Sequence, residues 1–493
     1  MKRVLLVAAL LVSAASCARP QAVREPAVAG SFYPADAKEL AAMVDGFLAK
    51  AQPPPIKDVV ALVSPHAGYV YSGQVAAYSY ALLKGRKFSR VVVIAPTHYD
   101  AFDFTAVFDG SAYKTPLGTV PVDRAFAAKL ASGGSSIRLS DHGHAVTADK
   151  REHALEDQLP FLQRVLGQFE LVPVVMGRQD YAASRELGVK LAKLVAGTDT
   201  LIVASSDMSH YHPYDYAEKV DHKTLRAIEE WDYLSLSRNF ERNIWEACGG
   251  APIVAAMIAS ERLGATEATV LKYANSGDVT GDKTRVVGYG AVAFSKAPAG
   301  ATPARAEFTL NDKEKSELLS LARRSVETAV KEHKFYDYTV DGSSSLTQER
   351  GAFVTLKEHG VLRGCIGYTA PIKPLPLVVR DVAAYAALED HRFRPVVTNE
   401  LGELEYEISV LSPLRRLQDT KQVEIGKHGL LIVRGDKEGL LLPQVASDEH
   451  WDRKTFLEQL CLKADLPLEA WRDPASDIFT FTALVFGDRA RRQ

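Results

Sequence analysis

Four short runs of the chain are almost continuously apolar, at residues 59–64, 90–95, 171–176 and 201–205. Strands that are covered on both faces show this pattern, because neither face carries polar side chains to water. Longer amphipathic segments lie between the runs, and two of them, residues 35–51 and 181–196, repeat apolar positions at helical spacing. The alternation predicts an α/β fold, in which a sheet is flanked by helices, for residues 24–296.

The pattern changes at SKAPAGATPARAE, residues 295–307, which are rich in Ala, Pro and Gly and hold few large apolar residues. Such a composition indicates a linker, which we place at residues 297–306. Residues 307–493 should then form a second domain.

The second domain begins with a charged amphipathic segment, residues 312–332, whose start Asn311 or Asp312 could cap. A helix-like segment at residues 451–463 closes a series of strand-like pieces: GAFVTLKEHGVLRGCIGY, ELEYEISVLSPL, HGLLIV and GLLLP. The mixture predicts a separate α+β domain.

A chain of 493 residues has room for two or three domains of ordinary size. Its 59 Lys and Arg residues balance 61 Asp and Glu residues, which leaves a formal net charge of −2. No basic field is present that would attract a polyanion, so no nucleic-acid partner is implied.

The N-terminus, MKRVLLVAALLVSAASC, has two basic residues, an apolar run and then small residues, as export signals do. The run is shorter than the roughly 20 residues that span a bilayer. Its ending resembles a bacterial lipobox. We therefore expect a lipoprotein-type signal peptide at residues 1–17, lipidation of Cys17, and an exported periplasmic or cell-surface lipoprotein anchored in the membrane. Plain secretion is the alternative.

Lipidation of Cys17 would leave three cysteines: Cys248, Cys365 and Cys461. This odd number suggests no disulfide framework, although a bridge between Cys365 and Cys461 stays open in an oxidising compartment.

Polar, titratable side chains follow three of the apolar runs. His66 comes just after the first run, His98 just after the second, and Asp207 and His210 just after the fourth. Ligands bind beyond the carboxyl ends of strands in open α/β sheets. A lone histidine at a strand end is more often structural, but three at equivalent positions indicate a site at the rim of the sheet.

Cys248 lies in WEACGGAPIV, shortly before Pro252, which suits the first turn of a helix. We expect the helix dipole to favour the thiolate, which is the form that binds metal, although a free cysteine is often only a small core residue. Two imidazoles and a thiolate would suit iron, copper or zinc.

In REHALEDQLPFL, His153 and Glu156 are three residues apart and would share one face of a helix. They could orient a ligand histidine or handle a proton behind the ligands. A solvated helix start is the alternative.

Seven segments follow one another along the first domain: AGSFYP, PHAGYVYSG, APTHYD, TPLG, EHALEDQLPFL, SSDMSHY and CGGAP. Together they resemble the Memo-like family, also called AmmeMemoRadiSam system protein B. The resemblance implies a fold similar to the class III extradiol dioxygenases, which use non-haem Fe(II). It matches His66, His98 and Cys248 to the metal ligands and His210 to an acid/base histidine, with Asp207 beside it.

The cysteine of this motif stands where the dioxygenases have a carboxylate. Because a thiolate is a softer ligand, it favours copper or zinc more than the iron triad does. The implied cofactor is non-haem iron, with copper or zinc as alternatives, and ring cleavage itself is not implied.

In the second domain, GVLRGCIGY (residues 360–368) predicts a strand that enters a tight turn bounded by glycines and leaves again. Arg363, Gly364 and Cys365 would form an anion or thiol site there, or simply a strand turn with a packed cysteine. LRGCIG, DVAAYAALEDHRFRPV, LEYEISVLSPL and GLLLPQVA resemble the Ammecr-type domain, AmmeMemoRadiSam system protein A. That resemblance implies a mixed domain with antiparallel strands and leaves the role of the motif unknown.

Three functions stay open. The first is a metal-dependent redox or oxygen-using enzyme acting on an unknown small molecule or peptide, and the second is a non-catalytic metal- or peptide-binding surface lipoprotein. A hydrolase relying on His210 and Asp207 is a third, without a Gly-x-Ser-x-Gly elbow to support it. The family resemblance also implies a radical S-adenosylmethionine enzyme as a partner, whereas export away from the reducing cytosol argues against one.

Overall fold

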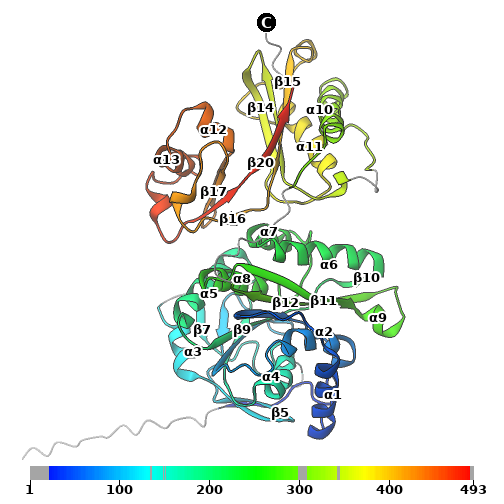
Figure 1. The fold of residues 1–493 in the computed structure, drawn as a ribbon, viewed down its shortest axis with the longest axis vertical. Coiled ribbons are helices and arrows are strands. Elements are labelled where there is room, and N and C mark those ends of the chain that lie inside the picture. The colour runs from blue at the N-terminus through cyan, green and yellow to red at the C-terminus, as the bar shows by residue number, and fades with distance from the viewer. Residues whose placement is uncertain are drawn as a thin grey trace, which may run out of the picture.

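The computed structural model describes residues 22–133, 136–147, 149, 151–297, 308–340 and 345–488, which fold into two domains stacked end to end (Figure 1). The predicted signal peptide with Cys17, and the predicted linker apart from Ala297, lie outside the described residues. No helix within the described ranges has both the length and the apolar character needed to cross a bilayer.

The first domain is built on a mixed sheet with strand order β10-β12-β2-β9-β3-β8-β4-β7, to which β11 adds by pairing with β12. Its strands are β2 (Val59–Ser64), β3 (Arg90–Pro96), β4 (Thr105–Val107), β7 (Ile137–Leu139), β8 (Glu170–Met176), β9 (Thr200–Ser205), β10 (His210–His212), β11 (Glu267–Asn275) and β12 (Val286–Ser295). A small separate sheet joins β1 (Val23–Arg24), β5 (Ala112–Thr115) and β6 (Gly118–Pro121).

Helices cover both faces of this sheet. They are α1 (Ala37–Lys50), α2 (Tyr69–Ala81), α3 (Arg124–Ala131), α4 (Leu159–Leu166), α5 (Tyr181–Val195), α6 (Tyr214–Glu229), α7 (Tyr233–Glu241), α8 (Gly250–Arg262) and α9 (Ser276–Thr280), with a 3-10 turn, η1 (Glu156–Gln158), before α4. In β3, Val92 and Ile94 pack with the core under α5 and α8, whereas Val91 and Val93 pack with the core under α1, α2 and α4. The predicted α/β sheet is confirmed, and its strands are continuously apolar because each has two dry faces.

The central strands β2, β9, β3 and β8 run parallel to one another. Their carboxyl ends therefore meet at one edge, where His66, His98 and the loop after β9 leave the sheet. All four predicted central strands are confirmed, as are the two helices predicted at residues 35–51 and 181–196, which form α1 and α5.

The second domain contains two antiparallel sheets, in the orders β14-β13-β15-β20 and β16-β19-β17-β18. The elements are α10 (Asp312–Glu332), α11 (Leu375–Leu388), α12 (Pro443–Asp448), α13 (Arg453–Lys463), β13 (Ala352–Glu358), β14 (Val361–Tyr368), β15 (Leu404–Leu411), β16 (Arg415–Arg416), β17 (Gly429–Arg434), β18 (Lys437–Leu441), β19 (Asp477–Phe481) and β20 (Ala483–Gly487), with 3-10 turns η2 (Ser345–Thr347), η3 (Thr398–Glu400), η4 (Thr420–Gln422) and η5 (Ala470–Arg472). Asn311, not Asp312, caps α10 by accepting the Glu314 N–H. Cys365 and Cys461 are free thiols.

The turn predicted within residues 360–368 is wrong, because β14 continues from Val361 to Tyr368, with only a shift in its register opposite Leu356 and Lys357. The glycines serve packing instead. A Cβ on Gly364 would lie 2.1 Å from the carbonyl oxygen of Ala386 in α11, and one on Gly367 would meet the ring of Phe353. Close approach of α11 therefore explains Gly364, and the cross-strand ring of Phe353 in β13 explains Gly367.

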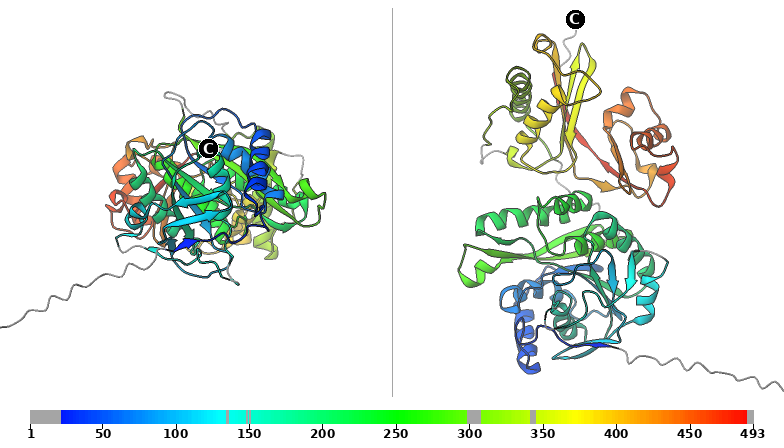
Figure 2. Two further views of the ribbon diagram at one scale, coloured as in Figure 1. Left: turned by 90° about the horizontal axis from the view of Figure 1, so that it is seen from below. Right: turned by 180° about the vertical axis from the view of Figure 1, so that it is seen from behind.

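The two domains share one buried interface. Tyr233 of α7 packs edge to face on Phe479 of β19, with ring centroids 5.7 Å apart. Buried Asp477 accepts hydrogen bonds from Tyr181 (2.8 Å), Arg185 (2.6 Å) and Arg262 (3.0 Å) of the first domain. Burial would raise the pKa of Asp477, but the two arginines hold that pKa below its ordinary value. Figure 2 shows the same stacking of the domains from behind.

Replacing Asp477 with Asn should lower the free energy of unfolding by about 3 kcal/mol at pH 7, because it leaves two arginines facing a buried site without their carboxylate. A depressed carboxyl pKa contributes stability that is present above the unfolded-state pKa and is lost as pH falls through the folded-state pKa. The difference between wild type and D477N, followed by urea unfolding, should therefore shrink below about pH 4.

Asp465→Asn is the control, because Asp465 pairs with Lys437 at the exposed surface, where an ion pair contributes little to stability. A D477N effect no larger than that of D465N, or one unchanged down to pH 3, would contradict this interpretation of the interface.

Candidate metal centre

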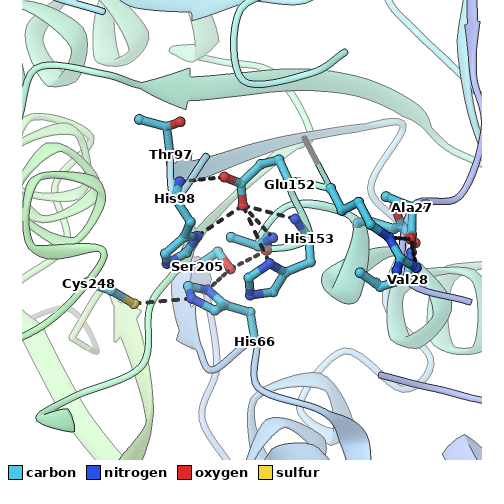
Figure 3. A network of polar contacts seen from close by, with 12 residues as sticks. Ala27, Val28, His66, Thr97, His98, Glu152, His153, Ser205 and Cys248 are labelled. Atoms are coloured by element: carbon cyan, nitrogen blue, oxygen red, sulfur yellow. Dashed lines mark hydrogen bonds and ion pairs between the residues drawn. The ribbon is translucent and has the colours of Figure 1, made fainter. Parts of the chain in front are cut away.

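Three donor side chains meet at the carboxyl edge of the first domain's sheet. One ligand atom from each of His66, His98 and Cys248 lies within 4.8 Å of the other two (Figure 3). The closest pair is His66 Nε2 and Cys248 Sγ, 3.1 Å apart. His66 is buried rather than presented at the surface, Cys248 is half-buried, and His98 is exposed on one side. The structure thus brings together the three residues expected at the rim.

Asp207 ties two of the three ligand segments of this cluster, those of His66 and Cys248, to each other. Its buried carboxylate accepts the backbone N–H of His66 (2.8 Å) and of Ala67 (3.3 Å), beyond the end of β2. Its own N–H donates to Cys248 Sγ at 3.2 Å. Burial raises the pKa of Asp207 above its ordinary value, while the His66 N–H opposes that rise. Asp207, which lies two positions beyond the end of β9, thereby positions both His66 and Cys248.

The segment carrying Cys248 reaches β9 only because Gly249 has no side chain. A Cβ there would lie 2.3 Å from the carbonyl oxygen of Ser205 and 2.7 Å from Cβ of Ser206. The N–H of Gly249 instead donates to Ser206 Oγ at 2.9 Å, just before α8 begins.

The expected effect of the helix on the Cys248 thiol is not observed. Burial, followed by the charge of Asp207, raises the pKa of Cys248 well above its ordinary value. Desolvation outweighs the helix dipole because the sulfur is enclosed between strand ends. Burial at this position therefore favours the thiol of Cys248 over its thiolate.

Glu152, which the sequence patterns did not single out, holds His98. Its carboxylate accepts the His98 backbone N–H at 2.5 Å and faces His98 Nδ1 at 3.0 Å. Burial would raise the pKa of Glu152, but the contacts with His98 lower it to about 2. Burial would likewise lower the pKa of His98, and the bond to Glu152 raises it overall. The Nδ1–H of His98 therefore points at the carboxylate, which leaves Nε2 for the cluster.

His153 lies beside the cluster but not on a helix. Its ring stacks on His98, with centroids 4.9 Å apart, and meets His66 edge-on at 5.5 Å. Burial and the charge of His66 lower the pKa of His153 to about 3. His98, Glu152 and His153 form a second group of potential metal ligands.

The shared helix face predicted for His153 and Glu156 is wrong, because regular structure starts only at η1 and the α-helix at Leu159. Fully buried Glu156 instead binds the N-terminal segment: it accepts the N–H groups of Ala27 (2.7 Å) and Val28 (3.1 Å) and pairs with Arg24. It is not a solvated residue either, and its contacts anchor the start of the domain rather than a ligand.

The remaining predicted residues lie at two places. His210 begins β10, and its Nδ1 donates to the carbonyl oxygen of Met208 at 2.9 Å. It lies close enough to His66 and Asp207 to be part of their electrostatic surroundings. Arg363 and Cys365 belong to the second domain, where Arg363 pairs with Glu400 and the Cys365 N–H donates to Asp390.

The donor set fits a metal ion. Imidazole nitrogens and a cysteine sulfur are ligands for iron, copper and zinc. Each histidine also has its distal nitrogen held by a protein group, Ser205 for His66 and Glu152 for His98, as ligand histidines generally do. His66, His98 and Cys248 would hold the ion.

The fold and this cluster define an α/β protein with candidate metal ligands at the carboxyl edge of a largely parallel sheet. The chain belongs to the Memo-like family, whose model, described as Memo-like protein, matches residues 24–293. This family is related to the class III extradiol dioxygenases. The AMMECR1 model matches residues 319–486, so the chain is a fusion of the two domains.

Relatives of the first domain are found among archaea. The MEMO1 family protein MK0963 of Methanopyrus kandleri is 38% identical over 286 residues, covering 55% of this chain and 99% of the relative. A MEMO1 family protein of Methanosarcina mazei is 39% identical over 279 residues, covering 55% and 98%. Among solved structures, the crystal structure of the uncharacterized protein PH0010 from Pyrococcus horikoshii is 36% identical over 37% of this chain, a shorter stretch than the first domain, and over 95% of its own, with a TM-score of 0.36.

Gly249→Ala should lower the free energy of unfolding by about 1–3 kcal/mol, because the new methyl group cannot fit against the Ser205 carbonyl. Urea unfolding measures the change. Gly46→Ala in α1 is the matched control, since a Cβ at Gly46 meets nothing within 4 Å. Equal stability of the two variants would contradict the proposed packing of the Cys248 segment on β9.

Glu152→Gln should weaken Zn²⁺ binding to the metal-free protein by about 10–100-fold, because the amide replaces the charge that orients His98. A competition titration against a chromophoric chelator measures the affinity. Glu246→Gln is the control, because Glu246 makes a similar 2.8 Å contact with His212 outside the cluster. Equal affinities of the two variants would remove the role assigned to Glu152.

Proposed function

We propose that this protein binds one transition-metal ion, non-haem iron, at His66, His98 and Cys248 and uses it in redox or oxygen chemistry on a small molecule or peptide. The observation that carries the proposal is the convergence of the three donor atoms within 4.8 Å of one another. Bound there, the ion would supply a Lewis-acidic, redox-active centre with positions open to substrate.

The protein's own groups would support that chemistry in distinct ways. His66 and Cys248 lie on the inner side of the cluster, which limits the access of water, whereas His98 lies on the exposed side where a substrate can approach. His210 donates its Nδ1–H to a carbonyl, so its Nε2 carries the lone pair and can take up a proton.

The sulfur ligand makes copper and zinc the alternatives to iron. Deprotonation of Cys248 is needed for each of these metals, and the raised pKa of the thiol makes ion binding release a proton.

A second candidate function is a non-catalytic binding protein that holds a metal or a peptide. It is favoured by exposed aromatic side chains beside the cluster: Tyr99 next to His98 is 48% exposed, and Tyr211 next to His210 is 62% exposed. Aromatic side chains of this kind are enriched where proteins bind partners.

Other parts of the proposal come from the sequence alone. Export through the signal peptide, a lipid anchor on Cys17 and a periplasmic or cell-surface location remain proposals, as does association with a radical S-adenosylmethionine enzyme. They lead us to place the reaction at a membrane surface.

Cys248→Ala should remove the metal from protein purified without oxygen, as measured by elemental analysis, because two imidazoles alone hold a divalent ion weakly. Cys365→Ala, which changes a half-buried cysteine in the second domain, is the control and should retain stoichiometric metal. Metal-dependent oxygen uptake with added catechols or thiols supports the enzyme. Metal without turnover supports the binding protein, and full metal content in C248A contradicts the metal site at Cys248.

A further inference from the structure

A chain of buried polar side chains runs from His66 into the core of the first domain. His66 Nδ1 lies 2.8 Å from Ser205 Oγ, Ser205 Oγ lies 2.7 Å from Gln158 Nε2, and Gln158 Oε1 lies 2.5 Å from the Tyr80 hydroxyl. Ser205, Gln158 and Tyr80 are all fully buried. The sequence patterns gave Ser205 and Gln158 no role.

Two backbone carbonyls set the direction of every hydrogen bond in this chain. Gln158 Nε2 lies 3.0 Å from the carbonyl oxygen of Pro65, which can only accept, so the amide nitrogen must lie at this end. Its second hydrogen then points at Ser205 Oγ. The Tyr80 hydroxyl, at the other end, donates to the amide oxygen.

Ser205 is constrained in the same way. Its Oγ lies 2.5 Å from the carbonyl oxygen of Ala154, so its single proton must be donated there. The Ser205 oxygen already accepts from Gln158. Toward His66 it has only a lone pair to offer.

We infer that Ser205 and Gln158 fix the tautomer of His66, so that the ring carries its proton on Nδ1 and directs the Nε2 lone pair at Cys248 Sγ. The purpose of this arrangement rests on the proposed metal site. The hydrogen bonds that fix the tautomer do not depend on it. Ser205 and Gln158 are positioning residues: they present the metal-binding nitrogen before any ion arrives, and the neutral ring needs no reorganisation to bind one.

The two histidines are thus held by different means. Glu152 holds His98 through a carboxylate, whereas His66 depends on neutral groups whose directions are set by the Pro65 and Ala154 carbonyls. The His66 arrangement adds no charge to the buried side of the cluster, where an unpaired carboxylate would be costly.

The direct test is two-dimensional NMR of the imidazole nitrogens in the metal-free, full-length protein labelled with ¹⁵N-histidine at neutral pH. The His66 signals are assigned from a His66→Asn variant. We expect the Nδ1–H tautomer in the wild type. The Nε2–H tautomer, or a rapid mixture of the two, overturns the inference whether or not the protein binds metal.

Ser205→Ala should release the ring, shift His66 toward a tautomer mixture and weaken Zn²⁺ binding by about 10–100-fold. Ser260→Ala is the matched control, because Ser260 is equally buried and its Oγ has no hydrogen-bond partner among the described residues. Unchanged tautomer and affinity in S205A overturn the inference.

The tautomer of His66 and the binding of metal are tested independently of each other. If the wild type shows the Nδ1–H tautomer, S205A loses it, and neither protein binds Zn²⁺ or Fe²⁺, the inference stands and the proposed function fails. If S205A does not fold, the tautomer of the wild type alone still decides.

Discussion

The candidate centre depends on one buried carboxylate, that of Asp207. Three segments that are far apart in the chain reach the same edge of the sheet, and strand pairing alone does not fix how their loops lie. The carboxylate binds the two N–H groups that follow β2, while the N–H of the same residue binds the sulfur that precedes α8. Because Asp207 lies only two residues beyond the end of β9, the loops are held relative to the sheet itself.

Around this tie, the protein positions donor atoms with buried hydrogen bonds rather than with surface charges. Glu152 and Ser205 each hold one imidazole, and Gly249 lets the cysteine segment lie against β9. Such positioning is effective in a dry interior, where a misdirected polar group loses the full value of its hydrogen bond. The same dryness disfavours the thiolate of Cys248, so the ion itself must provide the charge that makes the sulfur a ligand.

Much of the fold could be predicted because its strands are apolar on both faces, a pattern typical of strands covered on both sides of a sheet. The convergence of His66 and His98 could be predicted from their places after parallel strands. The sequence misled where geometry departs from regular elements: His153 and Glu156 have helical spacing, yet the helix starts later, and the adjacent Glu152 became the partner of His98. The sequence did offer one signal for Glu152, because this carboxylate directly precedes His153, which was already singled out.

The glycines at residues 364 and 367 misled for a related reason, since glycine marks close packing as well as turns, and only the positions of α11 and of the Phe353 ring distinguish the two. Ser205 and Gln158 could not have been found from the sequence, because their roles depend on carbonyl groups brought close by the fold.

X-ray absorption spectroscopy of the iron-loaded full-length protein tests the central claim most directly. The account predicts two imidazole nitrogens and one sulfur around the ion, with the sulfur signal absent when Cys248 is replaced by alanine. A coordination shell made only of nitrogen and oxygen in the wild type would contradict it.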